Sequence, residues 1–289
     1  MKDISLEGDY VKLTNTSLTS AAGNISISGS GGAEHAGVAM AGNVLMNAAA
    51  GAITVNASGE RTSTWNGGAN QYTNLNDFGG LNFNNGSNVT FNALNTSINA
   101  TGNFSKVINY YYEDGGAGAI VFHSNARVTF EGNATINATA PNGTGIFYQE
   151  SNLNQASYTV NVKDNAHVTI NASGGIYGIV GHAAWLTPGN PAAAWKAVFN
   201  VGQNATLDIN AATTGRTGFP AIATQAWPKS TPAWAPTDSL TFSGKGDVNV
   251  NATVENGNAV LARYLDNMAL TGNLTLTGRS QSGSGIVID

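Results

Sequence analysis

A short alternating pattern of apolar and polar residues recurs along the chain and usually ends in Asn-Ala. In Val168-Thr169-Ile170-Asn171-Ala172 every second side chain is apolar, which is the periodicity of a half-buried β-strand. Close copies are Ile53–Ala57, Val89–Ala93, Ala134–Ala138, Leu207–Ala211 and Val248–Ala252, and two looser copies are Ile25–Ser28 and Leu274–Thr277. Because an internal repeat fixes the architecture, the chain is predicted to fold as one repeating domain.

Each repeat is predicted to hold three strand-like pieces in a constant order. The second piece is the Asn-Ala phrase, and a first and a third piece flank it. The alternating first pieces are Val11–Leu13, Val44–Met46, Leu81–Phe83, Val128–Phe130, Tyr158–Val162, Val198–Val201, Leu240–Phe242 and Met268–Leu270. The short apolar third pieces are Gly37–Val38, Thr62–Trp65, Ile120–Phe122, Gly145–Phe147, Ile176–Val180, Ala221–Ala223, Ala259–Leu261 and Gly285–Ile288. This order predicts an all-β fold, a single-stranded parallel β-helix of about eight turns with three strands each.

The stacking of turns places equivalent residues in columns. Ile136, Ile170, Ile209 and Val250 are predicted to form one inward column, while the Thr and Asn residues of the phrase point outward. An up-and-down barrel would need antiparallel hairpins, and it predicts no three-piece order.

The spacing of the copies is unequal, which indicates constant strands joined by variable loops. Four long stretches follow third pieces and are therefore expected at one corner of the β-helix, side by side. They are Asn66–Gly80, Tyr148–Ser157, His182–Ala197 and Thr224–Asp238. A separate insertion, Asn95–Gly116, follows a second piece and carries Tyr110-Tyr111-Tyr112.

Composition supports one β-rich domain over residues 1–289. Of 289 residues 36 are Gly, only 10% are charged, and the net charge is −5, which favours neither nucleic acid nor an anionic membrane as partner. The chain has no Cys and no apolar run long enough to cross a bilayer. Met1–Ile4 is not followed by the apolar segment of a signal peptide, and Gly285–Asp289 resembles a strand interrupted within a repeat. We therefore expect an excerpt of a longer protein.

Tryptophan residues in two of the same-corner loops are the first candidate binding residues. Indole rings stack on the C–H faces of sugars, and nearby cationic groups can meet the carboxylate of an acidic sugar. The candidates are Trp185, Trp195, Trp227, Trp234, Lys196, Lys229, Arg216 and His182. The alternative is that these rings pack the long loops against the flank of the β-helix.

Asn-X-Ser/Thr sequences are frequent and allow glycosylation of outward-facing Asn side chains. The candidates are Asn56, Asn88, Asn137, Asn171 and Asn251. The competing structural role is a ladder of stacked amides, which we favour for Asn56, Asn137, Asn171 and Asn251.

The sequence offers little for catalysis or metal binding. Glu113-Asp114 is the one adjacent carboxylate pair, and neighbouring side chains of a strand point apart. The four His show no zinc-binding spacing, and no Asp-containing Gly-rich repeat for Ca²⁺ recurs. We expect no enzyme, no metal and no cofactor.

The phrases NATINAT, VTINASG, VNVNATV and GNLTLTG, with the absence of Cys, resemble the large adhesins of Gram-negative two-partner secretion. Within that group the chain is most similar to HMW-type high-molecular-weight adhesins, relatives of filamentous haemagglutinin. The resemblance implies a right-handed β-helix, export through a dedicated outer-membrane pore, and an extracellular location on the bacterial surface. It also implies binding to host-cell glycans or glycoproteins, with sialylated glycans the expected class, and Asn modification by a cytoplasmic glycosyltransferase.

Two other functions stay open at this point. A polysaccharide-degrading β-helix of the tailspike or lyase type would need clustered carboxylates, which are sparse here. A purely structural adhesin stalk would not need long Trp-containing loops.

Overall fold

The computed structural model describes residues 2–32, 35–61, 79–104, 118–149, 156–182, 195–214, 219–224, 239–262 and 264–288. In this part of the chain every regular element is a β-strand, and every strand pair is parallel. No helix here has the length and apolar character needed to span a bilayer. The fold is thus all-β and consistent with a parallel β-helix.

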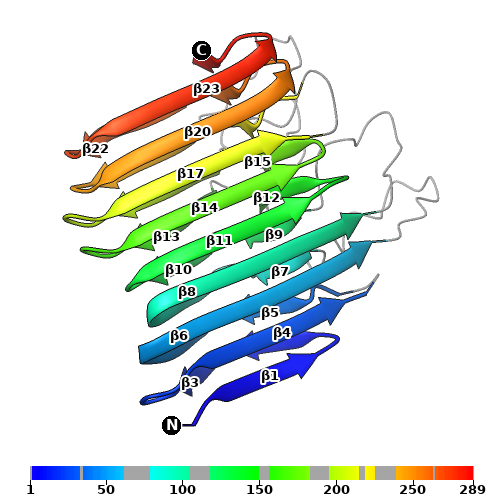
Figure 1. Ribbon diagram of the computed structural model, residues 1–289, viewed down its shortest axis with the longest axis vertical. Coiled ribbons are helices and arrows are strands. Elements are labelled where there is room, and N and C mark those ends of the chain that lie inside the picture. The colour runs from blue at the N-terminus through cyan, green and yellow to red at the C-terminus, as the bar shows by residue number, and fades with distance from the viewer. Residues whose placement is uncertain are drawn as a thin grey trace.

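The strands form two sheets, and the strands of each sheet are stacked along the long axis of the molecule (Figure 1). Sheet A has 15 strands. They are β1 (Ile4–Gly8), β3 (Ser17–Thr19), β4 (Ile25–Gly31), β6 (Asn43–Arg61), β8 (Asn88–Phe104), β10 (Arg127–Phe130), β11 (Asn133–Ala140), β13 (Ala156–Val162), β14 (His167–Gly174), β16 (Trp195–Val201), β17 (Thr206–Thr213), β19 (Ser239–Gly244), β20 (Asp247–Asn256), β22 (Tyr264–Leu270) and β23 (Leu274–Ser282). Sheet B has nine strands. They are β2 (Val11–Thr14), β5 (Val38–Ala41), β7 (Gly79–Phe83), β9 (Gly118–His123), β12 (Thr144–Gln149), β15 (Tyr177–His182), β18 (Ile222–Ala223), β21 (Val260–Ala262) and β24 (Ile286–Ile288).

Sheet A has two arms that meet in the long strands β6 and β8. The first half of β8 pairs with β10, and its second half pairs with β11. From there one arm runs β10, β13, β16, β19, β22, and the other runs β11, β14, β17, β20, β23. The second arm continues through the later halves of β8 and β6 to β4 and β1. We call the surface formed by all these strands the Asn-Ala face.

The predicted inward column on the Asn-Ala face is confirmed. Ile136 lies beside Ile170, Ile170 beside Ile209, and Ile209 beside Val250, and all four are buried. The Ala of each phrase forms a second buried column, including Ala138, which lies near the corner where sheet B approaches. At Gly29 in the same column even a Cβ atom does not fit, because it would lie 2.0 Å from the carbonyl oxygen of Gly37.

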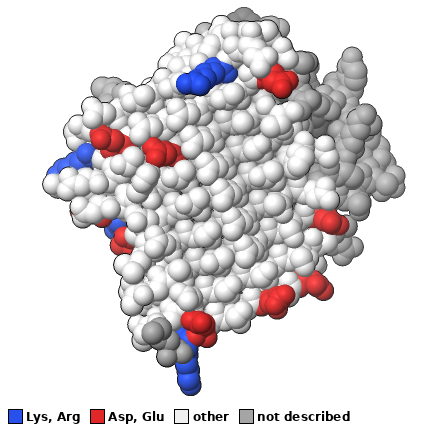
Figure 2. Space-filling view, viewed as in Figure 1, with Lys and Arg blue, Asp and Glu red and all other residues white. Residues whose placement is uncertain are grey.

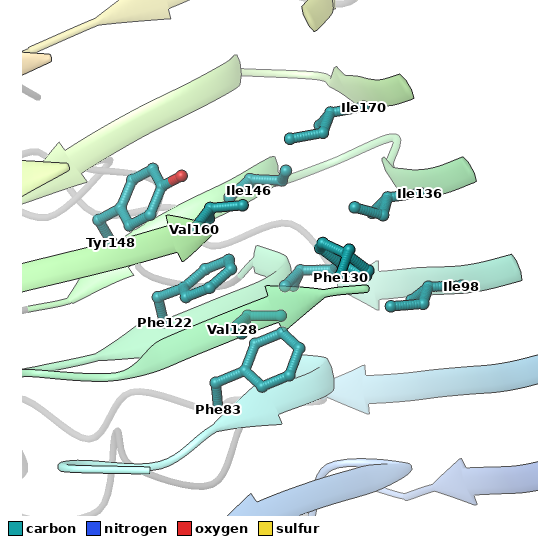
Figure 3. A pocket seen from close by; sticks show the side chains of 11 residues that line it. Phe83, Ile98, Phe122, Val128, Phe130, Ile136, Ile146, Tyr148, Val160 and Ile170 are labelled. Carbon is teal, nitrogen blue, oxygen red and sulfur yellow. The ribbon is translucent and has the colours of Figure 1, made fainter. Parts of the chain in front are cut away.

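Aliphatic columns and stacked aromatic rings fill the space between the sheets. Phe91 stacks on Phe130 with 5.3 Å between ring centroids, and Phe199 stacks on Phe242 in the same way further along. The core contains a small void of about 20 Å³, lined by apolar residues and Tyr148 (Figure 3). That volume has room for about one water molecule, so this void is not a site for a larger ligand.

The phase of the repeat in its early part differs from the prediction. Val89–Ala93 was expected to be an Asn-Ala copy, but it lies in the first half of β8 and pairs with Val44–Ala48 and with β10. The copy on the Asn-Ala face is Ile98-Asn99-Ala100, within the stretch expected to be an insertion. Ile4-Ser5-Leu6-Glu7 is a further copy, because β1 pairs with β4 in the same register.

Two expected first pieces belong to sheet B. Val11–Leu13 forms part of β2 and Leu81–Phe83 forms part of β7, and both strands pair with β5. Strand β7 thereby takes the place expected for Thr62–Trp65, which lies outside the described residues.

Three of the four long stretches expected at one corner connect neighbouring strands, as predicted. Strands β12, β15 and β18 are neighbours in sheet B, and the strands that follow them, β13, β16 and β19, are neighbours in sheet A. The prediction for Asn66–Gly80 is wrong. That stretch connects β6 to β7, a passage from sheet A to sheet B, and corresponds to the connection from β8 to β9.

Candidate functional site

A ladder of Asn side chains runs along the outer surface of the Asn-Ala face. Each amide nitrogen donates to the amide oxygen one strand earlier, with N···O distances of 2.9–3.1 Å. The members, in order, are Asn56, Asn99, Asn137, Asn171, Asn210 and Asn251. The phrase produces this arrangement because its Asn is an outward residue at one fixed register position. The predicted amide ladder is confirmed.

Similar polar columns occur on the other arm of sheet A. Asn200 donates to Asn161 at 2.8 Å, and Asn161 donates to Thr129 at 3.1 Å. Ser243 continues the column by donating to Asn200. Amide and hydroxyl groups are thus held in fixed positions on both arms.

The Asn-Ala face carries few charges (Figure 2). It is white over most of its area, and the Lys, Arg, Asp and Glu side chains that are visible lie mostly near its borders. Neutral donors and acceptors in fixed rows suit a neutral polar ligand such as a sugar better than a strongly charged polymer.

One His–Asp pair interrupts the polar columns. His167 Nε2 lies 2.6 Å from Asp208 Oδ2, and Asn249 donates to Asp208 Oδ1 at 2.8 Å. Burial of Asp208 opposes ionisation, but the hydrogen bonds from Asn249 and His167 and the charge of His167 outweigh it and lower the pKa of the carboxyl. The carboxylate is therefore held ionised and oriented at the surface.

Most of the predicted glycan-binding residues lie outside the described residues: Trp185, Trp227, Trp234, Lys229 and Arg216. Trp195 begins β16, His182 ends β15, and Lys196 is exposed on β16 beside Ser157 and Ser239. Trp195 and His182 thus bracket the junction at residues 183–194. The strands that flank Arg216 are β17 and β18, which form a different junction.

The predicted glycosylation sites differ in how their amides are used. Asn137, Asn171 and Asn251 donate from Nδ2, the atom that a sugar would occupy, into the ladder. Asn88 Nδ2 donates to Asn43 at a longer distance of 3.4 Å. Asn56 is the acceptor at the start of the ladder, so its own amide nitrogen is not used within the ladder.

A shallow depression on the other arm is a further candidate surface. It has a volume of about 580 Å³ and lies over β3, β6 and β8. Asn15, Asn43 and Asn88 line it, together with Ser17 and the exposed Leu45. Amides around one apolar side chain match the mixed polar and C–H surface of a sugar ring.

Within the described ranges, no group of three or more His, Asp or Glu side chains is placed to hold a metal ion. The chain matches no protein-family model, and it has no match among curated proteins or solved structures.

Sequence reasoning missed the His167–Asp208–Asn249 cluster. Its signal was present in the aligned phrases, because Asp208 and Asn249 occupy the position where Thr135 and Thr169 stand in other copies. It also missed Asn99, whose copy of the phrase was read as part of a loop.

Proposed function

We propose that this chain is a segment of a bacterial surface adhesin that binds host-cell glycans, sialylated ones in particular, without catalysis. The observation that carries the proposal is that the junctions flanking the Trp-containing stretches are neighbours, because β15 lies beside β18 in sheet B and β16 lies beside β19 in sheet A. The fixed rows of amides and hydroxyls on sheet A, with few charges between them, add a polar surface (Figure 2). Rigid surface groups lose little conformational entropy when a sugar displaces water from them.

The scaffold in this proposal is a right-handed, single-stranded parallel β-helix with three strands in each turn. Support comes from the chain order, in which a strand of the first arm, a strand of the Asn-Ala face and a strand of sheet B follow one another from β10 to β24. The extra copy in β1 favours about nine turns over eight.

The parent protein in this proposal is exported through an outer-membrane pore and displayed at the cell surface. A cytoplasmic glycosyltransferase would reach the amide of Asn56 more readily than that of Asn137 or Asn171, because the amide nitrogens of the latter two are held in ladder hydrogen bonds. The ladder thereby distinguishes between Asn-X-Ser/Thr sites that have the same sequence pattern.

The sugar-binding site is proposed at the junctions around β15–β16 and β18–β19, which are neighbours. A single shallow sugar site binds weakly, with a Kd of about 1 mM and a binding free energy of about −4 kcal/mol. Adhesion therefore depends on many copies of the protein on each cell. A polysaccharide-degrading enzyme remains the second candidate, and a plain stalk the third.

Removing one stacking ring should weaken binding by about 1 kcal/mol or more, which is roughly fivefold in Kd. Trp185, Trp195, Trp227 and Trp234 are each replaced by Ala, and binding to a sialylated glycoprotein is measured by biolayer interferometry. Trp65→Ala is the matched control, because its flanking strands β6 and β7 form a different junction.

Far-UV circular dichroism establishes that each variant is folded. If all four folded variants bind as the parent does, the site is not at these junctions, and Tyr110–Tyr112 and the depression beside Leu45 are tested next. Lys196→Ala and desialylation of the glycoprotein are compared in the same assay. If both reduce binding to a similar extent, the result supports recognition of the acidic sugar.

A further inference from the structure

Small, neutral polar side chains cover a continuous part of the Asn-Ala face. They occupy three outward positions on each of the adjacent strands β4, β6, β8, β11 and β14, and the register aligns them in three rows. The rows run from Ser26 to Thr169, from Ser28 to Asn171, and from Ser30 to Ser173, and every member is Ser, Thr or Asn. We call this surface the polar grid.

No charged or aromatic residue belongs to the polar grid. Two of its rows continue into carboxylates, because Glu7 on β1 pairs with Ser28 and Asp208 on β17 pairs with Thr169. Figure 2 shows few charged side chains on this face of the molecule. The grid is therefore an uncharged patch that reaches a charged residue in each direction along the stack.

The polar grid is held rigid from below and within its middle row. The inward neighbours Ile27, Val55 and Ile136 are buried in the core. Hydrogen bonds of 2.9–3.0 Å orient the amides of the middle row from Asn56 to Asn171. Polar groups therefore repeat at about 4.8 Å between strands and at about 6.6 Å along each strand.

The amides of the middle row keep hydrogen-bonding capacity for a ligand. Asn137 donates one N–H to Asn99 and accepts one bond from Asn171. A side-chain amide has two N–H donors and an oxygen with two lone pairs, so the ladder uses half of this capacity. The grid can thus both donate and accept hydrogen bonds at regular intervals.

This chemistry narrows the class of ligand. A sugar ring needs an aromatic or other large apolar side chain against its C–H face, and a mineral or charged polymer needs charged groups. The polar grid offers neither. Ice matches it, because water is neutral and both donates and accepts hydrogen bonds. The oxygen atoms on a prism face of ice also repeat at two spacings close to those of the grid.

We propose that the polar grid is an ice-binding surface. Its hydroxyl and amide groups hold water molecules at positions that continue into the crystal lattice, and the rigid array loses little conformational entropy on contact. Ice does not advance where the protein is adsorbed, so the bound chain slows crystal growth. The grid lies apart from the junctions around β15–β16 and β18–β19, so this inference does not rest on glycan binding.

Recrystallisation of ice in a thin frozen film tests the proposal with the intact chain, which should keep the crystals small. Thr135→Lys and Thr139→Lys each place a charge at an exposed position of the grid. Each should raise the protein concentration needed by about tenfold or more, because a charge desolvated against ice has no partner. Thr14→Lys, at an exposed position of β2 in sheet B, is the matched control and should act as the parent does.

Circular dichroism establishes that the three variants are folded. Coarse crystals at every concentration of the parent chain overturn the proposal, as does equal activity of the parent and both grid variants. If the parent leaves ice unchanged but binds cellulose, and Thr135→Lys abolishes that binding, the grid recognises a neutral polysaccharide instead. Thr135→Lys should bind the sialylated glycoprotein as the parent does, so the ice and glycan results succeed or fail independently.

Discussion

Replacing Ile170 by Asp should destabilise the chain by roughly 4 kcal/mol or more, because the substitution buries an unpaired carboxylate. Ile170 is 3% exposed and lies between Ile136 and Ile209 in the inward column of the Asn-Ala face. No cationic side chain lines the small void beside it. The strands on either side depend on this contact for their own burial, so the damage should spread along the stack.

The matched control is Thr135→Asp, on the neighbouring strand β11. Thr135 is exposed, and the same outward column already holds Asp208. Chemical denaturation followed by circular dichroism should show a large loss for Ile170→Asp and less than about 0.5 kcal/mol for Thr135→Asp. Equal losses in the two variants would mean that the inward and outward assignment is wrong.

Replacing Asn171 by Ala should cost about 1–2 kcal/mol, because this residue has two bonds in the ladder. It donates to Asn137 at 2.9 Å and accepts from Asn210 at 3.0 Å. Asn251 is the last member of the ladder and makes one such bond, to Asn210. Asn251→Ala should therefore cost about half as much.

Ser173→Ala is the control for this pair, because Ser173 lies two residues further along the same face of β14. Free energies of unfolding from urea titration give all three values. The expected order is Asn171→Ala, then Asn251→Ala, then Ser173→Ala. A loss at Asn171 no greater than that at Ser173 would show that the ladder contributes nothing to stability.

The middle and later repeats were predictable from sequence because alternation and the Asn-Ala phrase together specify both the strand and its register. The column from Ile136 to Val250 and the amide ladder follow directly from these two features. Local pattern and long-range pairing agree there, so no further information was needed.

The early repeats were not predictable in the same way. Val89–Ala93 and Ile98–Ala100 have the same alternation, and β8 passes from one to the other without Gly or Pro. Periodicity gives the face of a strand, but it does not say which arm of a sheet the strand joins. Only the pairing of Val89 with Val44 and Val128 resolves the two copies.

The His167–Asp208–Asn249 cluster and the proposed sugar site could not be predicted from sequence for a second reason. His167 meets Asp208 across two strands that are distant in sequence, and this contact depends on the register of whole turns. The Trp-containing stretches have no repeat to fix them, so sequence indicates their chemistry and the strands that flank them, and little else. Their residues lie largely outside the described part of the chain.

Glycan binding without turnover is tested most directly by incubating the intact chain with a sialylated glycoprotein. Saturable binding is measured before and after sialidase treatment of the glycoprotein, and the supernatant is analysed by mass spectrometry for released sugars. We predict saturable binding that falls after sialidase treatment, with the glycoprotein recovered unchanged. Release of oligosaccharide or sialic acid by the chain itself, or no binding at any concentration, would contradict the adhesin proposal.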